Sequence, residues 1–163
     1  MPLTRIKSLG ITDGTIVNAD IDTAAAIATS KLGAGAVLQV VTATDLTQRS
    51  TTSTSFVTGS NTLSVTITPS SISNKIFITV TTEVYASGIV GTYTIYRGAT
   101  NLGNGTNGMT EHRMDWGTMC MSYLDSPATT SATTYQVYFK VGSGTGYLNN
   151  GNTASITAFE IKG

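Results

Sequence analysis

Charged residues are scarce in this chain, and their scarcity argues against several classes of protein. Only 11% of its 163 residues are Asp, Glu, Lys or Arg, and nine basic residues balance nine acidic ones. A neutral chain without charge runs lacks the basic surface that binds phosphates, so we expect no nucleic-acid partner. Low charge also leaves little repulsion between copies, which favours a subunit of an assembly.

Cysteine is nearly absent, and long apolar runs are missing. Cys120 is the only cysteine, which excludes an internal disulfide. No apolar run approaches the roughly 18 residues of a membrane-spanning helix, so we expect no membrane partner. The start Met-Pro-Leu-Thr-Arg has no apolar stretch after its charge, and we therefore expect no secretory signal.

Strand patterns fill the chain from Val37 onward. In the clearest one, residues 75–85, isoleucine and valine alternate with threonine and glutamate, as in a strand with one buried face. Further strands are predicted at 37–44, 63–68, 91–97, 99–102, 114–124, 135–141, 147–148 and 155–162, with a short stretch near Phe56. About eight strands separated by turn residues predict an all-β fold, a jelly-roll-like antiparallel β-sandwich head over residues 37–163.

Residues 1–36 differ from this head and predict an extended N-terminal attachment arm. Gly10 and Gly14 divide its first part into short extended pieces, and Asp22 could cap at most one short helix over residues 23–32. Its apolar residues are too widely spaced to form a core, so we expect them to be buried against partner subunits or a larger particle. The predicted attachment residues are Ile6, Leu9, Ile11, Ile16, Ile21 and Ile27. The alternative is a disordered tail, although such tails are usually poor in apolar residues.

The strands predicted at 114–124 and 155–162 are apolar on both faces. One face of each lines the sandwich, so the other needs a cover, and a neighbouring subunit is the simplest one. The predicted subunit interface contains Met119, Met121, Tyr123, Phe159 and Ile161. The alternative is a cover formed by an arm or loop of the same chain.

Two local motifs resemble functional sites only superficially. The only histidine, His112, lies among the acids of Glu111–Asp115, but the spacing is not that of a zinc site. Residues 103–108 match G-x-G-x-x-G by letters, yet no helical pattern follows to hold a pyrophosphate. We expect a polar loop or strand edge at the first motif and a surface loop at the second.

Catalytic groups are not indicated elsewhere. Glu83 with Glu111 or Asp115 could form a carboxylate pair, but nothing distinguishes these from ordinary surface acids. Cys120 lies within an apolar strand without a base patterned beside it, so we expect a buried, inert thiol. We therefore predict no enzymatic activity, no metal and no cofactor.

Residues 14–32 of the arm read G-T-I-V-N-A-D-I-D-T-A-A-A-I-A-T-S-K-L. This segment is similar to one common in tail-fibre and other virion proteins of bacteriophages, particularly marine and cyanobacterial ones. Residues 66–76, 96–103, 123–137 and 156–161 resemble globular heads of the same group. The resemblance implies a homotrimer of β-sandwich heads whose arms attach to the particle, without cofactor or catalytic residue.

Unlike a typical tail fibre, the chain has no long repetitive shaft between arm and head. A short arm suits a protein clamped on a surface, as trimeric decoration (cement) proteins are on phage capsids. We therefore predict a homotrimeric capsid decoration protein that binds the major capsid protein through its arm and lies on the capsid surface of the virion. The alternative is a short trimeric tail fibre or receptor-binding tip. Its arm would bind tail proteins, and exposed loops such as 103–109, with Trp116 and Tyr147 nearby, would recognise a host glycan. A glycan-degrading enzyme is the third alternative.

Overall fold

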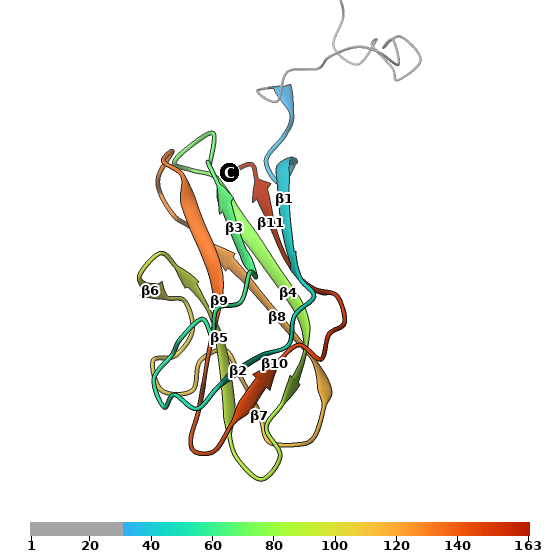
Figure 1. Cartoon of the computed structure of the whole chain (residues 1–163). Coiled ribbons are helices and arrows are strands. Elements are labelled where there is room, and N and C mark those ends of the chain that lie inside the picture. The colour runs from blue at the N-terminus through green and yellow to red at the C-terminus, as the bar shows by residue number, and fades with distance from the viewer. Residues whose placement is uncertain (1–30) are drawn as a thin grey trace, which may run out of the picture. The chain divides into compact units, whose positions relative to one another are not determined.

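Two antiparallel β-sheets face each other in this protein, whose computed structural model describes residues 31–163 (Figure 1). The six-stranded sheet contains β1 (Val37–Asp45), β11 (Ala154–Ile161), β4 (Lys75–Tyr85), β10 (Gly146–Leu148) and β2 (Arg49–Thr51) in that order, with β8 (Gly117–Asp125) also paired to β4. The five-stranded sheet contains β3 (Ser64–Ile67), β9 (Thr133–Val141), β5 (Gly91–Arg97) and β6 (Thr100–Asn101), with β7 (Thr110–His112) paired to β5.

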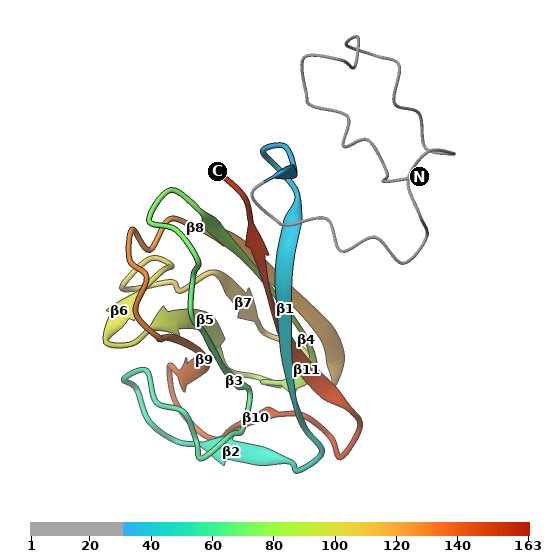
Figure 2. The same ribbon diagram turned by 90° about the horizontal axis from the view of Figure 1, so that it is seen from above.

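The connections between the sheets are those of a jelly roll. Along the chain, β3 lies in the smaller sheet, β4 in the larger, β5 in the smaller, β8 in the larger, β9 in the smaller and β11 in the larger. In two views at right angles, β1, β11 and β4 lie side by side, with β3 and β9 in the other layer (Figures 1 and 2). The predicted all-β, jelly-roll-like sandwich is therefore confirmed.

Strand β4 shows how the sequence specifies this arrangement. Its even-numbered residues from Ile76 to Val84 are buried, whereas its odd-numbered residues are partly or fully exposed. Val80 pairs with Ile156 of β11 on one side and with Met121 of β8 on the other. Because cross-strand partners share a face of the sheet, all three side chains enter the core between the sheets.

A hydrogen-bonded acid connects the two layers at the margin of this core. Asp125 at the end of β8 accepts two hydrogen bonds of 2.8 Å from Arg97 and one of 2.6 Å from Tyr135. Arg97 and Tyr135 belong to the smaller sheet and Asp125 to the larger, so this cluster fixes the two sheets against each other. Burial, together with the bond to Asp125, raises the pKa of the Tyr135 hydroxyl.

The predicted arm falls almost entirely outside the described residues. This applies to all six attachment residues, Ile6, Leu9, Ile11, Ile16, Ile21 and Ile27, and to most of the helix predicted at 23–32. Gly33–Gly163 form one compact unit, and Gly35 already donates a 2.7 Å hydrogen bond to the Lys162 carbonyl at the end of β11. Residues just before β1 thus belong to the sandwich.

Candidate functional site

Three aromatic side chains lie next to one another where β10, β4 and β8 meet. Tyr147 of β10 is paired in register with Tyr85, the last residue of β4. Trp116 directly precedes Gly117, which pairs with Val84 on the other side of β4. The ring centroids are 5.4 Å apart for Tyr85–Trp116, 5.7 Å for Tyr85–Tyr147 and 6.0 Å for Trp116–Tyr147. Each ring therefore contacts the other two.

These rings line a surface pocket of about 580 Å³. Its lining residues are Gln48, Tyr85, Ser87, Ile89, Trp116, Gly144, Thr145 and Tyr147. None of them carries a formal charge, so the wall combines aromatic and aliphatic surface with amide and hydroxyl groups. We call this site the aromatic pocket.

Two hydrogen bonds position the loop that carries Trp116. The amide of Ala86, just after β4, donates a 3.1 Å bond to the carbonyl of Met114. The His112 ring nitrogen Nε2 lies 2.7 Å from the carbonyl of Asp115, and it is the donor because a carbonyl only accepts. His112 thus holds the segment before Trp116, and this contact gives the histidine a structural role.

A second surface lies on the outer face of the larger sheet, toward the other end of β4. Val40, Phe159, Phe77 and Leu124 are consecutive partners across β1, β11, β4 and β8, so they form one apolar row. Val40 is 54% exposed, Phe77 36% and Leu124 50%. The Phe77 and Phe159 ring centroids lie 6.2 Å apart. This apolar row is thus continuous across four strands on the surface of the described chain.

The next two rows of this face are also uncharged. Pairing places Thr42, Thr157, Thr79 and Ser122 in one row and Thr44, Ser155, Thr81 and Cys120 in the next. Covering these rows would bury no ionised side chain, so it would avoid the largest desolvation cost in protein association. We call the three rows together the outer strip.

The residues predicted for the subunit interface are divided between core and surface. Met119 and Met121, which were predicted at the interface, lie in the core of their own chain, with exposures of 6% and 4%. Phe159 and Ile161 are partly exposed on the outer face of β11, and Tyr123 is 38% exposed. The outer face of β8 instead carries Cys120 and Leu124, because the methionines of this strand face the core. Cys120 is exposed, so the prediction of a buried thiol was wrong. The interface itself stays a prediction.

The polar motifs singled out in the sequence form local contacts in the described part of the chain. Glu111 forms a 2.7 Å ion pair with Arg113, and Glu83 accepts a hydrogen bond from Asn152. Residues 103–108 form a closed loop followed by strand β7, which agrees with the expected surface loop. Among residues 31–163, no group of His, Cys, Asp and Glu side chains could hold a metal ion, and no helix is long and apolar enough to cross a membrane.

Sequence reasoning named Trp116 and Tyr147 together but did not include Tyr85 or Gln48. The sequence signal that could have identified Tyr85 is its outward, odd-numbered position at the end of a predicted strand.

No protein-family model matches the chain, and no curated protein matches it. What the structure of residues 31–163 shows is a jelly-roll sandwich with an aromatic pocket and an uncharged outer strip.

Proposed function

We propose that this protein is a non-enzymatic, homotrimeric structural subunit of a bacteriophage particle, which decorates the capsid and attaches through residues 1–36. The observation that carries the proposal is the outer strip, three uncharged and at least partly exposed rows that extend across β1, β11, β4 and β8. A second and a third copy of the same chain are the occupants we propose for it.

The chemistry of the outer strip suits contact between copies. Burial of its apolar row would contribute about 25 cal/mol for each Å² removed from water. The Thr and Ser rows can form hydrogen bonds across an interface; within the chain, the Thr42 and Thr157 hydroxyls already lie 2.8 Å apart. Since the outer strip itself carries no charge, identical copies do not repel each other there, and closed rotational symmetry lets three copies share one axis.

The placement on a virion is supported by the resemblance of residues 14–32 and of several head segments to phage proteins. The absence of a shaft in the sequence favours a surface position over a projecting fibre. The proposed contacts of the arm with the capsid use its apolar residues, including Ile6, Ile11 and Ile16. Three linked arms would gain avidity over one.

The trimer is tested by measuring the molar mass of the full chain by light scattering during size-exclusion chromatography. We expect a trimer for the wild type and a monomer for Phe77→Glu, because a carboxylate in the apolar row is costly to bury. Ile72→Glu is the matched control, since Ile72 is 68% exposed in the β3–β4 loop, outside the outer strip. A monomeric wild type, or a Phe77→Glu variant that remains trimeric, would contradict the proposal.

The attachment is tested by immunogold labelling of virions with antibody against residues 37–163. Many labels scattered over the capsid are expected for a decoration protein. Capsid binding by the full chain should be lost when Ile6, Ile11 and Ile16 are replaced by Ser, while the molar mass stays that of a trimer. Undiminished binding by this variant would rule out attachment by the arm.

A short tail fibre or receptor-binding tip is the second candidate, and the aromatic pocket is the observation that favours it. Ring faces combined with amide and hydroxyl groups are suited to a host-surface ligand. Gold label confined to the tail would select this candidate over capsid decoration. It would leave the proposed trimer unchanged.

A further inference from the structure

We propose that the aromatic pocket is a binding site for neutral carbohydrate. The inference goes beyond the proposed structural role and applies equally to a capsid or a tail position. A sugar ring presents apolar C–H groups on its faces and hydroxyl groups around its edge. A suitable site therefore needs aromatic faces beside hydrogen-bonding groups, and the pocket combines both.

The aromatic part of the pocket is accessible and held in place. Trp116 is 37% exposed, and Tyr85 and Tyr147 are partly exposed. Strand pairing fixes Tyr147 beside Tyr85, and the Ala86–Met114 hydrogen bond holds the loop that carries Trp116. A ligand would meet rings that are already positioned, which lowers the entropy cost of binding.

The polar groups of the pocket are free to bind a ligand. Within residues 31–163, the side-chain hydroxyls of Ser87, Thr145, Tyr85 and Tyr147 make no hydrogen bond. Gln48 makes only a 3.3 Å contact with Asn150. These groups both donate and accept, as the hydroxyl groups of a sugar require.

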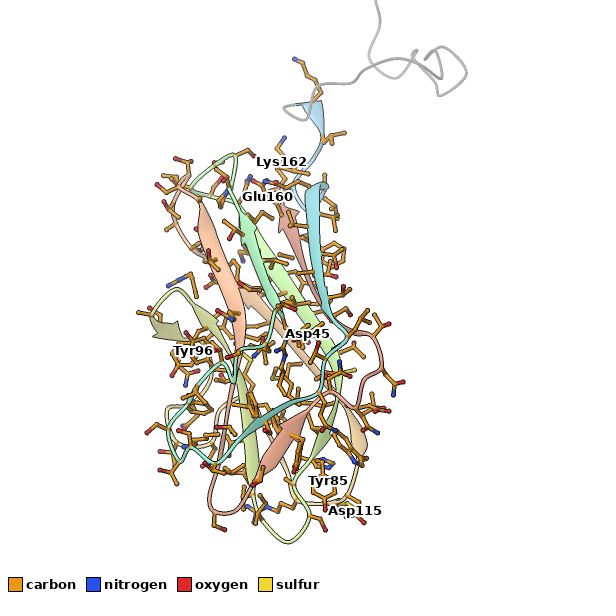
Figure 3. The ribbon with its side chains drawn as sticks, in the orientation of Figure 1. Asp45, Tyr85, Tyr96, Asp115, Glu160 and Lys162 are labelled. Atoms are coloured by element: carbon orange, nitrogen blue, oxygen red, sulfur yellow. The ribbon has the colours of Figure 1, made fainter. Side chains whose placement is uncertain are left out.

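The charge of the pocket selects against anionic polymers. No Lys, Arg or His lines it to neutralise a sulfate, phosphate or uronate group. The nearest acid in sequence is Asp115, directly before Trp116, and Tyr85 and Asp115 lie at the same end of the sandwich (Figure 3). A neutral sugar is therefore the ligand class that fits.

The aromatic pocket and the outer strip occupy different parts of β4. Tyr85 ends β4, at the end of the sandwich opposite to Glu160 and Lys162 (Figure 3). Thr81 is the outer-strip residue of β4 nearest to Tyr85, and the two are separated by about 13 Å along the strand at roughly 3.3 Å per residue. No residue of the pocket belongs to the outer strip, so subunit contacts there and a ligand in the aromatic pocket are compatible.

A second aromatic cluster provides an internal comparison. Tyr96 and Tyr138 stack with centroids 4.1 Å apart on the smaller sheet, and Phe56 lies 6.1 Å from Tyr96. The Lys140 ammonium lies 4.7 Å from the Phe56 ring centroid, so a cation already occupies that ring face. None of these residues lines the aromatic pocket.

The chain contains a built-in probe for this site, because Trp116 is its only tryptophan. We would titrate the full-length protein with a panel of neutral polysaccharides (dextran, galactomannan, arabinogalactan and xylan) and record tryptophan emission. Alginate and dextran sulfate are the anionic comparisons. We expect a saturable change with at least one neutral polymer that persists at about 0.5 M NaCl, because no charge is involved.

Variants locate the binding. Tyr147→Ala keeps Trp116 as the probe and should weaken binding about tenfold or more through loss of one ring face. Trp116→Ala, followed by affinity electrophoresis, should lose binding as well. Tyr138→Ala is the control and should bind like the wild type. Thermal unfolding of each variant checks that it is folded.

Three results would overturn the proposal. The first is an emission that no neutral polysaccharide changes, which needs only the wild-type protein. The second is binding restricted to the anionic polymers. The third is binding that Tyr138→Ala abolishes and Tyr147→Ala leaves unchanged. None of these results bears on the trimer, whose test is molar mass.

Discussion

Glu160 is a buried acid whose environment keeps it ionised. It is 1% exposed within β11, and its carboxylate accepts hydrogen bonds from the Ser70 amide and hydroxyl, from the Asn74 amide group and from the Gln39 amide group. Burial raises the pKa of Glu160, but the hydrogen bonds from Asn74, Gln39 and Ser70 prevail and lower it below its usual value. The charged form therefore stabilises the fold.

We predict that Glu160→Gln lowers the free energy of unfolding near pH 7 by about 2 kcal/mol, because hydrogen bonds to a charged acceptor are lost. A carboxyl with a lowered pKa in the folded state stabilises the protein above its unfolded pKa. That contribution is lost as the pH falls through the folded pKa. The difference between wild type and variant should therefore shrink from pH 7 to about pH 3 in urea unfolding experiments.

Glu111→Gln is the control for this prediction, because Glu111 is exposed and its partner Arg113 is at the surface. Its effect should stay within about 0.5 kcal/mol at either pH. An equal loss for Glu160→Gln at both pH values would show that the amide disturbs packing and that the charge contributes little.

Strand β8 carries apolar residues on both faces, and the structure distinguishes the two faces. Met119 and Met121 are buried in the core, whereas Cys120 is exposed in the outer strip between them. We predict that Met121→Ala lowers the free energy of unfolding by about 2–5 kcal/mol, because it leaves a cavity. Cys120→Ala should change it by about 0.5 kcal/mol or less.

Chemical denaturation of the two variants measures this difference directly. The pair is informative because the residues are adjacent in one strand and differ in the face they occupy. A larger loss for Cys120→Ala would place the core on the opposite face of β8. It would also remove Cys120 and Leu124 from the proposed interface.

The sequence predicts strongly patterned elements well and partner-dependent elements poorly. β4 has the predicted bounds, 75–85, because its alternation spans eleven residues. β2 and β7 were not predicted, since Arg-Ser-Thr and Thr-Glu-His are short and polar. These strands exist because β10 and β5 offer hydrogen-bonding edges, and no local pattern encodes that edge.

The same limit applies to the candidate sites. The pattern of β8 shows that both faces are apolar, but it does not indicate which face the second sheet covers. Tyr85 joins Trp116 and Tyr147 only through the register of β10 on β4, which depends on pairing between segments far apart in the sequence. Register is set by the whole sheet and is therefore visible only in the folded protein.

At the scale of the whole molecule, the two proposals make a joint prediction. A trimer would present three aromatic pockets to one polymer, and multivalent contact raises the apparent affinity. Phe77→Glu, which is expected to dissociate the trimer, should weaken binding to a long neutral polysaccharide about a hundredfold. Its affinity for a short oligosaccharide of the same sugar should not change, because Phe77 does not line the pocket.

Tryptophan emission titrations with the polymer and the oligosaccharide would measure both affinities. Ile72→Glu again serves as the control and should match the wild type in both titrations. Equal weakening of polymer and oligosaccharide binding by Phe77→Glu would show that the substitution alters the pocket itself. Unchanged polymer binding would show that the pockets act singly.

The pairing of β1 with β11 has a consequence for how the protein is made in the cell. β11 lies between β1 and β4 in the larger sheet, although β1 is the first strand of the sandwich and β11 the last. During translation, β1 and this edge of β4 therefore lack their partner until residue 161 has left the ribosome. Unpaired strand edges readily associate with other chains. Soluble production of the protein thus depends on keeping the nascent chain apart from its neighbours until synthesis has reached β11.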